Sequence, residues 1–211
     1  MSDLKVDGIT AATANTAVTI KGLGTGKVVL GDGNLVFPDA DGAAGTFITT
    51  NGSAALSFST AGKIVQVVNT QTGAVATGTT VTVLDDSIPQ NTEGNEFMTL
   101  AITPTSASNK LIIQASATTN TSVAGRQQQM NLFQDSTASA LASTLMYHET
   151  SGGYRTNTLS HYMAAGTTSA TTFKIRIGNN NTGTVTLNGI SGGRALGGAF
   201  SSFITITEIS V

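Results

Sequence analysis

Short runs in which apolar and polar residues alternate are the feature of this chain that most constrains its fold. In one run Phe173, Ile175 and Ile177 alternate with Lys174 and Arg176. A period of two residues is typical of a strand with one buried and one exposed face. Strands are predicted at 63–69, 79–84, 96–102, 110–118, 128–135, 141–147, 158–164, 171–178, 183–187 and 202–211. Residues 61–211 are therefore predicted to form one antiparallel β-sandwich, a jelly roll, within an all-β chain.

Composition excludes several classes of function. Charged residues make up 10% of the 211 residues, the net charge is −2 and there is no cysteine. A chain without a basic surface is not expected to bind nucleic acid, and one without cysteine has neither disulfides nor thiolate metal ligands. No apolar run approaches the roughly 20 residues of a membrane span. The first residues lack the pattern of a secretory signal, so we expect neither membrane insertion nor export.

The first 60 residues contain an imperfect repeat. Residues 26–37 read as two short strands joined at Asp32-Gly33, and residues 45–58 repeat this plan around Asn51-Gly52. Asp-Gly and Asn-Gly favour tight hairpin turns. Isolated hairpins are marginally stable, so residues 1–60 are predicted to be an anchor or an intertwined β-shaft that needs other chains. The aromatic residues expected at such subunit contacts are Phe37, Phe47 and Phe58.

The last predicted strand has apolar residues on both faces. Phe203 lies on one face, and Ile204 and Ile206 lie on the other. A terminal strand of this kind is expected to turn one face toward another subunit. We therefore also take Phe203, Ile204 and Ile206 as candidate interface residues.

Motifs of catalysis and cofactor binding are incomplete. Residues 22–28 lack the serine or threonine that a phosphate loop needs after its lysine, and residues 189–193 match a nucleophile-elbow pattern with no downstream histidine. His148-Glu149 lacks the second histidine of a zinc motif, and residues 39–42 lack the remaining ligands of a calcium loop. We predict no catalytic residue, no metal site, no cofactor and no enzymatic activity.

One segment is enriched in residues common at binding surfaces. Tyr147, His148, Tyr154 and Arg155 flank a glycine-containing loop. Tyrosine and arginine are over-represented at binding hot spots, so these four residues form a candidate surface-binding loop. An ordinary strand-end loop with amphipathic tyrosines is the alternative interpretation.

Four strings carry a family resemblance: residues 103–114 (TPTSASNKLIIQ), 132–142 (LFQDSTASALA), 161–176 (HYMAAGTTSATTFKIR) and 202–209 (SFITITEI). They resemble the C-terminal domain of structural proteins of tailed bacteriophages, and the repeat in residues 26–58 looks like shaft segments of such proteins. The resemblance implies a homotrimer located on the virion and bound to other virion proteins, such as the major capsid protein or tail and portal components. It supplies no catalytic residue.

The expected function is a capsid decoration or short head fibre, anchored by residues 1–60, with residues 61–211 projecting as a head. A receptor-binding tail-fibre tip that recognises a host surface glycan is the main alternative. A fibre-borne polysaccharide hydrolase and a cellular β-rich adhesin are further alternatives. The hydrolase would need paired carboxylates or a catalytic triad in a cleft.

Overall fold

The computed structural model describes residues 29–30, 35–36, 42–44, 46–50, 56–59 and 64–211. Contacts divide the chain into two compact units, Met1–Ala61 and Gly62–Val211. Every strand pair in the described residues is antiparallel, which confirms the all-β prediction. The described part of the chain contains no helix that is long and apolar enough to cross a membrane.

The first unit contains two short hairpins. They pair β1 (Val29–Leu30) with β2 (Leu35–Val36), and β3 (Phe47–Thr50) with β4 (Leu56–Ser59). Both hairpins fall where the repeat predicted them, whereas Asp32-Gly33 and Asn51-Gly52 lie outside the described residues. In the second hairpin Thr49 Oγ1 donates a hydrogen bond of 3.1 Å to the carbonyl oxygen of Ser57 on the facing strand.

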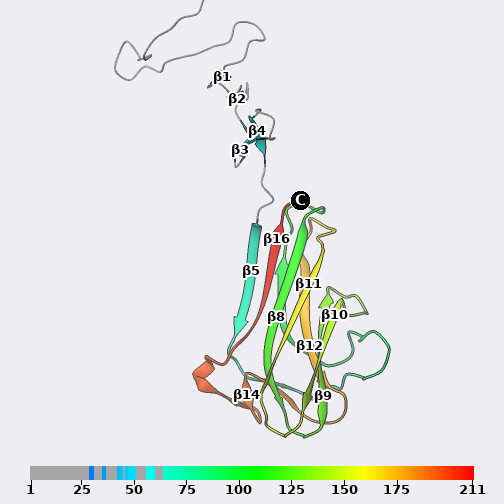
Figure 1. The fold of residues 1–211 in the computed structure, drawn as a ribbon. Helices are drawn as coiled ribbons and strands as arrows, with labels where there is room; N and C mark the ends of the chain where they lie inside the picture. Colours follow the sequence, from blue (N-terminus) through cyan, green and yellow to red (C-terminus); the bar gives the residue numbers. More distant parts are fainter. Residues whose placement is uncertain (1–28, 31–34, 37–41, 45, 51–55, 60–63) are drawn as a thin grey trace, which may run out of the picture. The chain divides into compact units, whose positions relative to one another are not determined.

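The second unit carries the remaining strands (Figure 1). They are β5 (Ile64–Thr72), β6 (Ala76–Gly78), β7 (Asn95–Ile102), β8 (Lys110–Thr121), β9 (Arg126–Gln134), β10 (Ala142–His148), β11 (Arg155–Ala164), β12 (Thr171–Asn179), β13 (Val185–Leu187), β14 (Gly189–Ile190), β15 (Gly193–Arg194) and β16 (Ser202–Ile209). A 3-10 turn at Leu196–Gly198 is the helical element of this unit.

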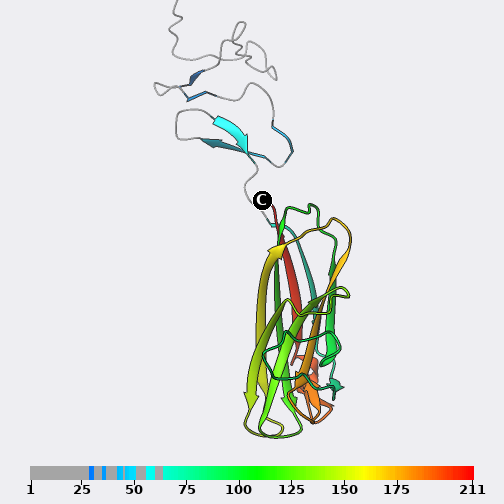
Figure 2. The same cartoon turned by 90° about the vertical axis from the view of Figure 1, so that its right-hand side faces the viewer.

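The order of the long strands is that of a jelly roll. One sheet has the order β10-β9-β12-β7, and the other contains β5-β16-β8 with β11 on the free edge of β8. If β5, β7, β8, β9, β10, β11, β12 and β16 are numbered in chain order, the two sheets read 1-8-3-6 and 2-7-4-5. This arrangement of two facing sheets is the eight-stranded jelly roll (Figure 2).

Strand β8 organises the larger sheet. Along one edge it pairs with β11 over residues 110–119, and along the other it pairs first with β16 and then with β13. Strand β6 adds to β13 and makes the sheet six-stranded. Strand β6 lies in the segment inserted before β7, and strand β13 lies in the segment inserted before β16. Both inserted segments therefore widen this sheet at one end.

Alternation within the strands produces the core. On β8 the inward residues Leu111, Ile113, Ala115 and Ala117 are buried. The inward residues of β12 are Phe173, Ile175 and Ile177, and they are buried as well. Together with Met98, Met130, Leu132, Leu159, Leu187, Ile204 and Ile206, these side chains form one apolar cluster between the sheets.

Two predictions about strands require correction. Residues 79–84 were expected to form a strand, yet they run as a loop against β12, where the backbone amide of Thr82 donates to the carbonyl oxygen of Asn179 at 2.9 Å. Ile204 and Ile206 were expected at a subunit interface, but both are fully buried in the core of their own chain. Their side chains cannot also cover another subunit.

Candidate binding groove

The four residues of the predicted binding loop separate in the structure. Strand β10 ends with Tyr147 and His148, and its period of two places Tyr147 outward with 52% of its surface exposed and His148 inward with 1% exposed. Tyr154 precedes β11, and Arg155 is its first residue. The structure therefore brings Tyr154 and Arg155 together, whereas Tyr147 points away from the core on a different strand.

His148 is a buried histidine and not a surface ligand, which corrects its assignment to the binding loop. Among the described residues neither ring nitrogen has a partner in full hydrogen-bond geometry, although the backbone of Gly153 is near enough to act on the ring. Burial lowers the pKa of His148, the backbone of Gly153 opposes this effect, and the nearby positive charge of Arg155 adds to it. The ring is consequently neutral at pH 7, packed at the end of the sandwich.

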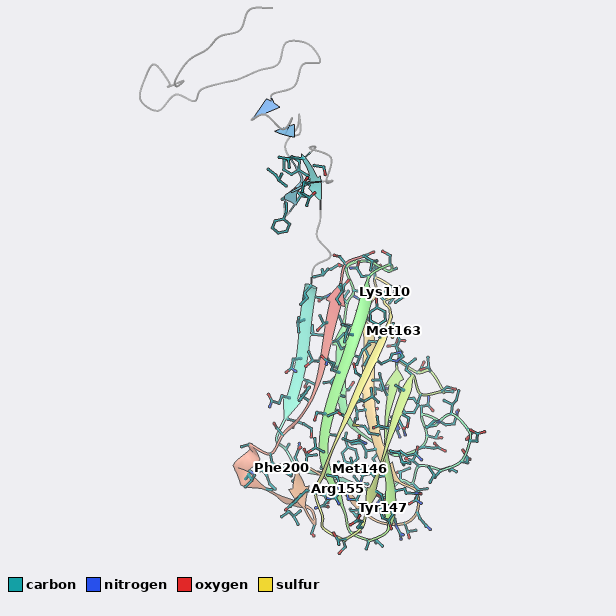
Figure 3. All side chains as sticks on the ribbon, in the orientation of Figure 1. Lys110, Met146, Tyr147, Arg155, Met163 and Phe200 are labelled. Atoms are coloured by element: carbon teal, nitrogen blue, oxygen red, sulfur yellow. The ribbon has the colours of Figure 1, made fainter. Side chains whose placement is uncertain are left out.

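A groove lies where the start of β11 meets the segment before β16. Its volume is about 480 Å³, and it is lined by Thr118, Tyr154, Arg155, Thr156, Ile190, Ala195, Leu196 and Phe200. The rings of Tyr154 and Phe200 meet edge to face, with centroids 5.4 Å apart and planes at 86°. Figure 3 shows Arg155 and Phe200 at one end of the jelly roll, and Lys110 and Met163 at the other.

The groove wall formed by residues 188–200 is anchored by Asn188. The side-chain amide of this fully buried residue donates to the carbonyl oxygens of Thr72 at 2.8 Å and Ala74 at 3.1 Å. Its Oδ1 accepts a hydrogen bond of 2.6 Å from the hydroxyl of Ser202. These bonds join the segment to both β5 and β16, so the position of the groove wall is fixed by the larger sheet.

The same wall is conformationally strained. Ser191 has φ of 47° and Leu196 has φ of 48°, values in the left-handed region that side chains larger than glycine seldom adopt. The left-handed conformation costs roughly 1–2 kcal/mol per residue. Gly189 has no room for a side chain, because a Cβ there would lie 2.2 Å from the carbonyl oxygen of Gly193.

Within the part of the chain that the structure describes, Arg155 is the only charged residue that lines the groove. Its Nη1 donates a hydrogen bond of 3.0 Å to the carbonyl oxygen of Tyr154. The ion pairs within residues 64–211 are those that Lys174 and Arg176 form with Glu96, at 3.7 Å and 3.8 Å. Within that range Arg155 therefore has no acidic partner, and its charge faces solvent at the rim.

The most strongly perturbed acid of the jelly roll lies elsewhere. Glu208 on β16 is fully buried and accepts hydrogen bonds from Gln66 Nε2 at 2.6 Å, and from the amide and hydroxyl of Thr105 at 2.8 and 2.9 Å. Burial alone would raise the pKa of Glu208, but hydrogen bonds from Gln66, Asn109 and Thr105 lower it to about 2. The carboxylate thus has a structural role, since the polar groups of its own chain surround it.

Among the residues that the structure describes, no three His, Cys, Asp or Glu side chains lie close enough to hold a metal ion. The predicted interface residues have varied positions. Phe47 is 59% exposed, Phe58 is partly buried, Phe203 lies on the outer face of β16, and Phe37 lies outside the described residues. The role of these phenylalanines in a subunit interface stays a prediction.

No protein-family model matches the chain, and no curated protein matches it. Among solved structures, the chain is similar to that of the infectious bursal disease virus Gx strain, with 11% identity and a TM-score of 0.36 over 74% of this chain and 42% of that chain. It is also similar to the infectious bursal disease virus VP2 subviral particle, with 11% identity and a TM-score of 0.31 over 73% of this chain and 41% of the other.

A third similar structure is the enzymatically active domain of bacteriophage CBA120 tailspike protein 4, with 18% identity and a TM-score of 0.26. It matches 61% of this chain and 19% of that chain. The chain thus spans less than half the length of each of these structures. Likeness at such TM-scores does not assign a function to the chain.

Proposed function

We propose that the chain is a non-enzymatic structural component of a tailed-phage virion, a homotrimeric capsid decoration or short head fibre. Residues 1–60 attach it to other virion proteins, and the jelly roll forms the projecting head. The phage assignment is supported by the sequence strings that resemble phage structural proteins. The observation that carries the assembly role is the outer face of the larger sheet.

That face is almost free of charge. The strand registers align Val67, Thr207, Ile112 and Tyr162 in one row across β5, β16, β8 and β11. The next two rows are Asn69, Thr205, Gln114 and Ser160, followed by Gln71, Phe203, Ser116 and Thr158. On the outward positions of these four strands, Lys110 is the only charged residue within residues 64–211.

The polar rows are already ordered by hydrogen bonds within the sheet. Asn69 Nδ2 donates to Thr205 Oγ1 at 2.8 Å, and Gln71 Nε2 donates to Ser201 Oγ at 2.8 Å. Apolar side chains flank these rows, with Val67 54% and Tyr162 61% exposed. An ordered face whose three central rows carry no charge loses little side-chain entropy and desolvates no ion when those rows are covered, as a subunit interface requires.

The outer face of the other sheet differs. It carries Lys174, Arg176 and Glu96, which form the two ion pairs of the jelly roll domain's described residues. Charged residues are depleted at the centres of interfaces. The contrast between the two faces supports association through the β5-β16-β8-β11 face, with the charged face left in water.

Immunogold electron microscopy of particles purified from the lysate of the producing bacterium tests this function. Antibodies raised against residues 62–211 are expected to label regularly spaced positions on the capsid. Label restricted to the tail tip would contradict a head decoration and favour the receptor-binding alternative. Recovery of the chain only in the particle-free fraction would overturn the virion assignment.

A further inference from the structure

Exposed apolar side chains gather around the groove at the start of β11. Leu196 is 77% exposed, and Tyr154 and Ile190 are also exposed beside it. Isolated exposed apolar residues are ordinary, whereas a cluster around a concavity marks a binding site. The volume of about 480 Å³ lies within the range of sites for small organic molecules.

Backbone strain points independently to the same place. Of the non-glycine residues with positive φ among those described, Asn188, Ser191 and Leu196 lie in this wall, and only Asp135 lies elsewhere. Strained residues persist only where the surrounding structure holds them, and they concentrate at binding and catalytic sites. Leu196 combines this left-handed backbone with an apolar side chain that is 77% exposed at the rim.

The charge at the rim specifies the kind of ligand. Arg155 lines the groove with no acidic residue beside it in the lining, and it has no ion pair within residues 64–211. A second guanidinium, that of Arg194, belongs to the wall segment of residues 188–200 and lies 3.5 Å from where a Cβ on Gly198 would be. An anionic group at this rim would gain charge-assisted hydrogen bonds that the chain itself leaves unmade.

The other polar groups of the groove argue against a polyhydroxylated ligand. The hydroxyls of Thr118 and Thr156 are hydrogen-bonded to each other at 2.9 Å. A sugar bound here would lose hydrogen bonds to water for its hydroxyls and find few partners in exchange. The lining instead matches a ligand with an apolar body and a single charge.

We propose that this groove binds a small amphipathic organic anion. Its apolar body lies against the Tyr154–Phe200 pair and Leu196, and its single carboxylate faces Arg155. This inference goes beyond the virion role. It requires that the proposed subunit interface leave open the end of the sheet face where Thr118 and Thr156 lie, one row beyond Ser116 and Thr158.

Titration of the full chain with 2-naphthoate tests the proposal, with 2-naphthalenemethanol as the uncharged comparison. For a probe of this size we expect a dissociation constant of about 1 mM or lower by calorimetry. The Ile190 methyl signal is expected to shift in the NMR spectrum. The uncharged alcohol is expected to bind roughly threefold or more weakly, because it cannot pair with Arg155.

Three variants locate the site. Leu196→Asn keeps a residue that tolerates the left-handed backbone and removes the apolar side chain, so folding is retained and naphthoate binding falls several-fold. Arg155→Gln reduces affinity for naphthoate roughly threefold and leaves the affinity for the alcohol unchanged. Leu145→Asn, a matched change at an exposed leucine of β10, leaves both affinities unchanged.

The proposal is overturned if naphthoate does not bind at 10 mM, or if its affinity is the same in the Leu196→Asn variant as in the unmodified chain. Equal affinity for the acid and the alcohol would exclude a role for Arg155 and contradict the anionic ligand. Binding of a neutral oligosaccharide that competes with naphthoate would contradict the assignment and favour glycan recognition.

Discussion

Asn109 Nδ2 donates a hydrogen bond of 2.6 Å to Glu208 Oε1, which joins the loop before β8 to the last strand of the jelly roll. Gln66 on β5 donates to the other carboxylate oxygen. A buried carboxylate without a cationic partner is stable only because several donors converge on it. Hydrogen bonds to Glu208 therefore link β5, β16 and the loop before β8 at a single point.

Glu208→Gln is expected to destabilise the jelly roll by about 2–3 kcal/mol at pH 7, since the new amide group would face the donors of Gln66, Asn109 and Thr105. Urea unfolding of both proteins measures the change. Glu96→Gln is the control, because its ion pairs are partly exposed and its loss is expected to cost less than about 1 kcal/mol. Equal effects of the two changes would contradict the structural role of Glu208.

The lowered pKa of Glu208 leads to a prediction of how the stability of the jelly roll depends on pH. The folded-state pKa of Glu208 is about 2, below the usual value of 4.5, so its contribution is complete above pH 4.5. It is lost as the pH falls from 4.5 toward 2, because the unfolded chain binds the proton first. Urea midpoints measured across this range should fall less steeply in Glu208→Gln than in the unmodified chain. Parallel profiles would contradict the lowered pKa.

His148 predicts a separate change at higher pH. Burial lowers the pKa of this histidine below 6.5 in the folded chain, so the unfolded chain takes up a proton first as the pH drops below 6.5. Stability is therefore lost in that range, and His148→Leu should remove this part of the loss. Because the desolvation of the ring outweighs its weak contact with the Gly153 backbone, the leucine variant should be at least as stable at pH 7. A strongly destabilised His148→Leu variant would contradict this account.

The corrected position of Ile206 gives a direct test of the core. Ile206→Ala is expected to lower the free energy of unfolding by about 2–5 kcal/mol without changing the oligomeric state, because the side chain is fully buried within its own subunit. Leu145→Ala, at an exposed position on β10 of the other sheet, is the control for folding. Loss of assembly with unchanged subunit stability in Ile206→Ala would restore its assignment to the interface.

Asn188 predicts how the groove wall is held. Asn188→Ala removes hydrogen bonds to Thr72, Ala74 and Ser202, and we expect a loss of about 2–4 kcal/mol. Hydrogen exchange of residues 189–200 should increase with it. Asn181→Ala, at an exposed position, should leave both quantities nearly unchanged. Unchanged exchange in Asn188→Ala would show that other contacts hold the wall.

Much of the fold could be predicted because burial and alternation agree along the central strands. Phe173, Ile175 and Ile177 show this on β12, where each inward residue is fully buried or nearly so. The prediction of a strand at residues 79–84 was wrong because it followed the high strand propensity of their threonines and valines. There Gly178 admits the loop against β12, since a Cβ on Gly178 would lie 2.3 Å from Thr82 Oγ1.

The binding groove could be predicted only in part. Tyr154 and Arg155 were identifiable as residue types common at binding surfaces. Phe200, Ile190 and Leu196 were missed, because residues 189–198 read as a glycine-rich loop and their proximity to β11 depends on tertiary contacts. His148 was assigned wrongly, since one residue along a strand reverses the face to which a side chain points.

The molar mass of the full chain in solution tests the central claim, self-association through the uncharged sheet face, most directly. Light scattering should give about 64 kDa, three times the 21.4 kDa of one chain. Thr205→Arg, in the middle polar row, should lower this mass because it buries an unpaired charge, whereas the matched change Thr99→Arg at an exposed position of β7 on the other sheet should not. A mass of 21.4 kDa for the unmodified chain, or a trimer unaffected by Thr205→Arg, would contradict the account.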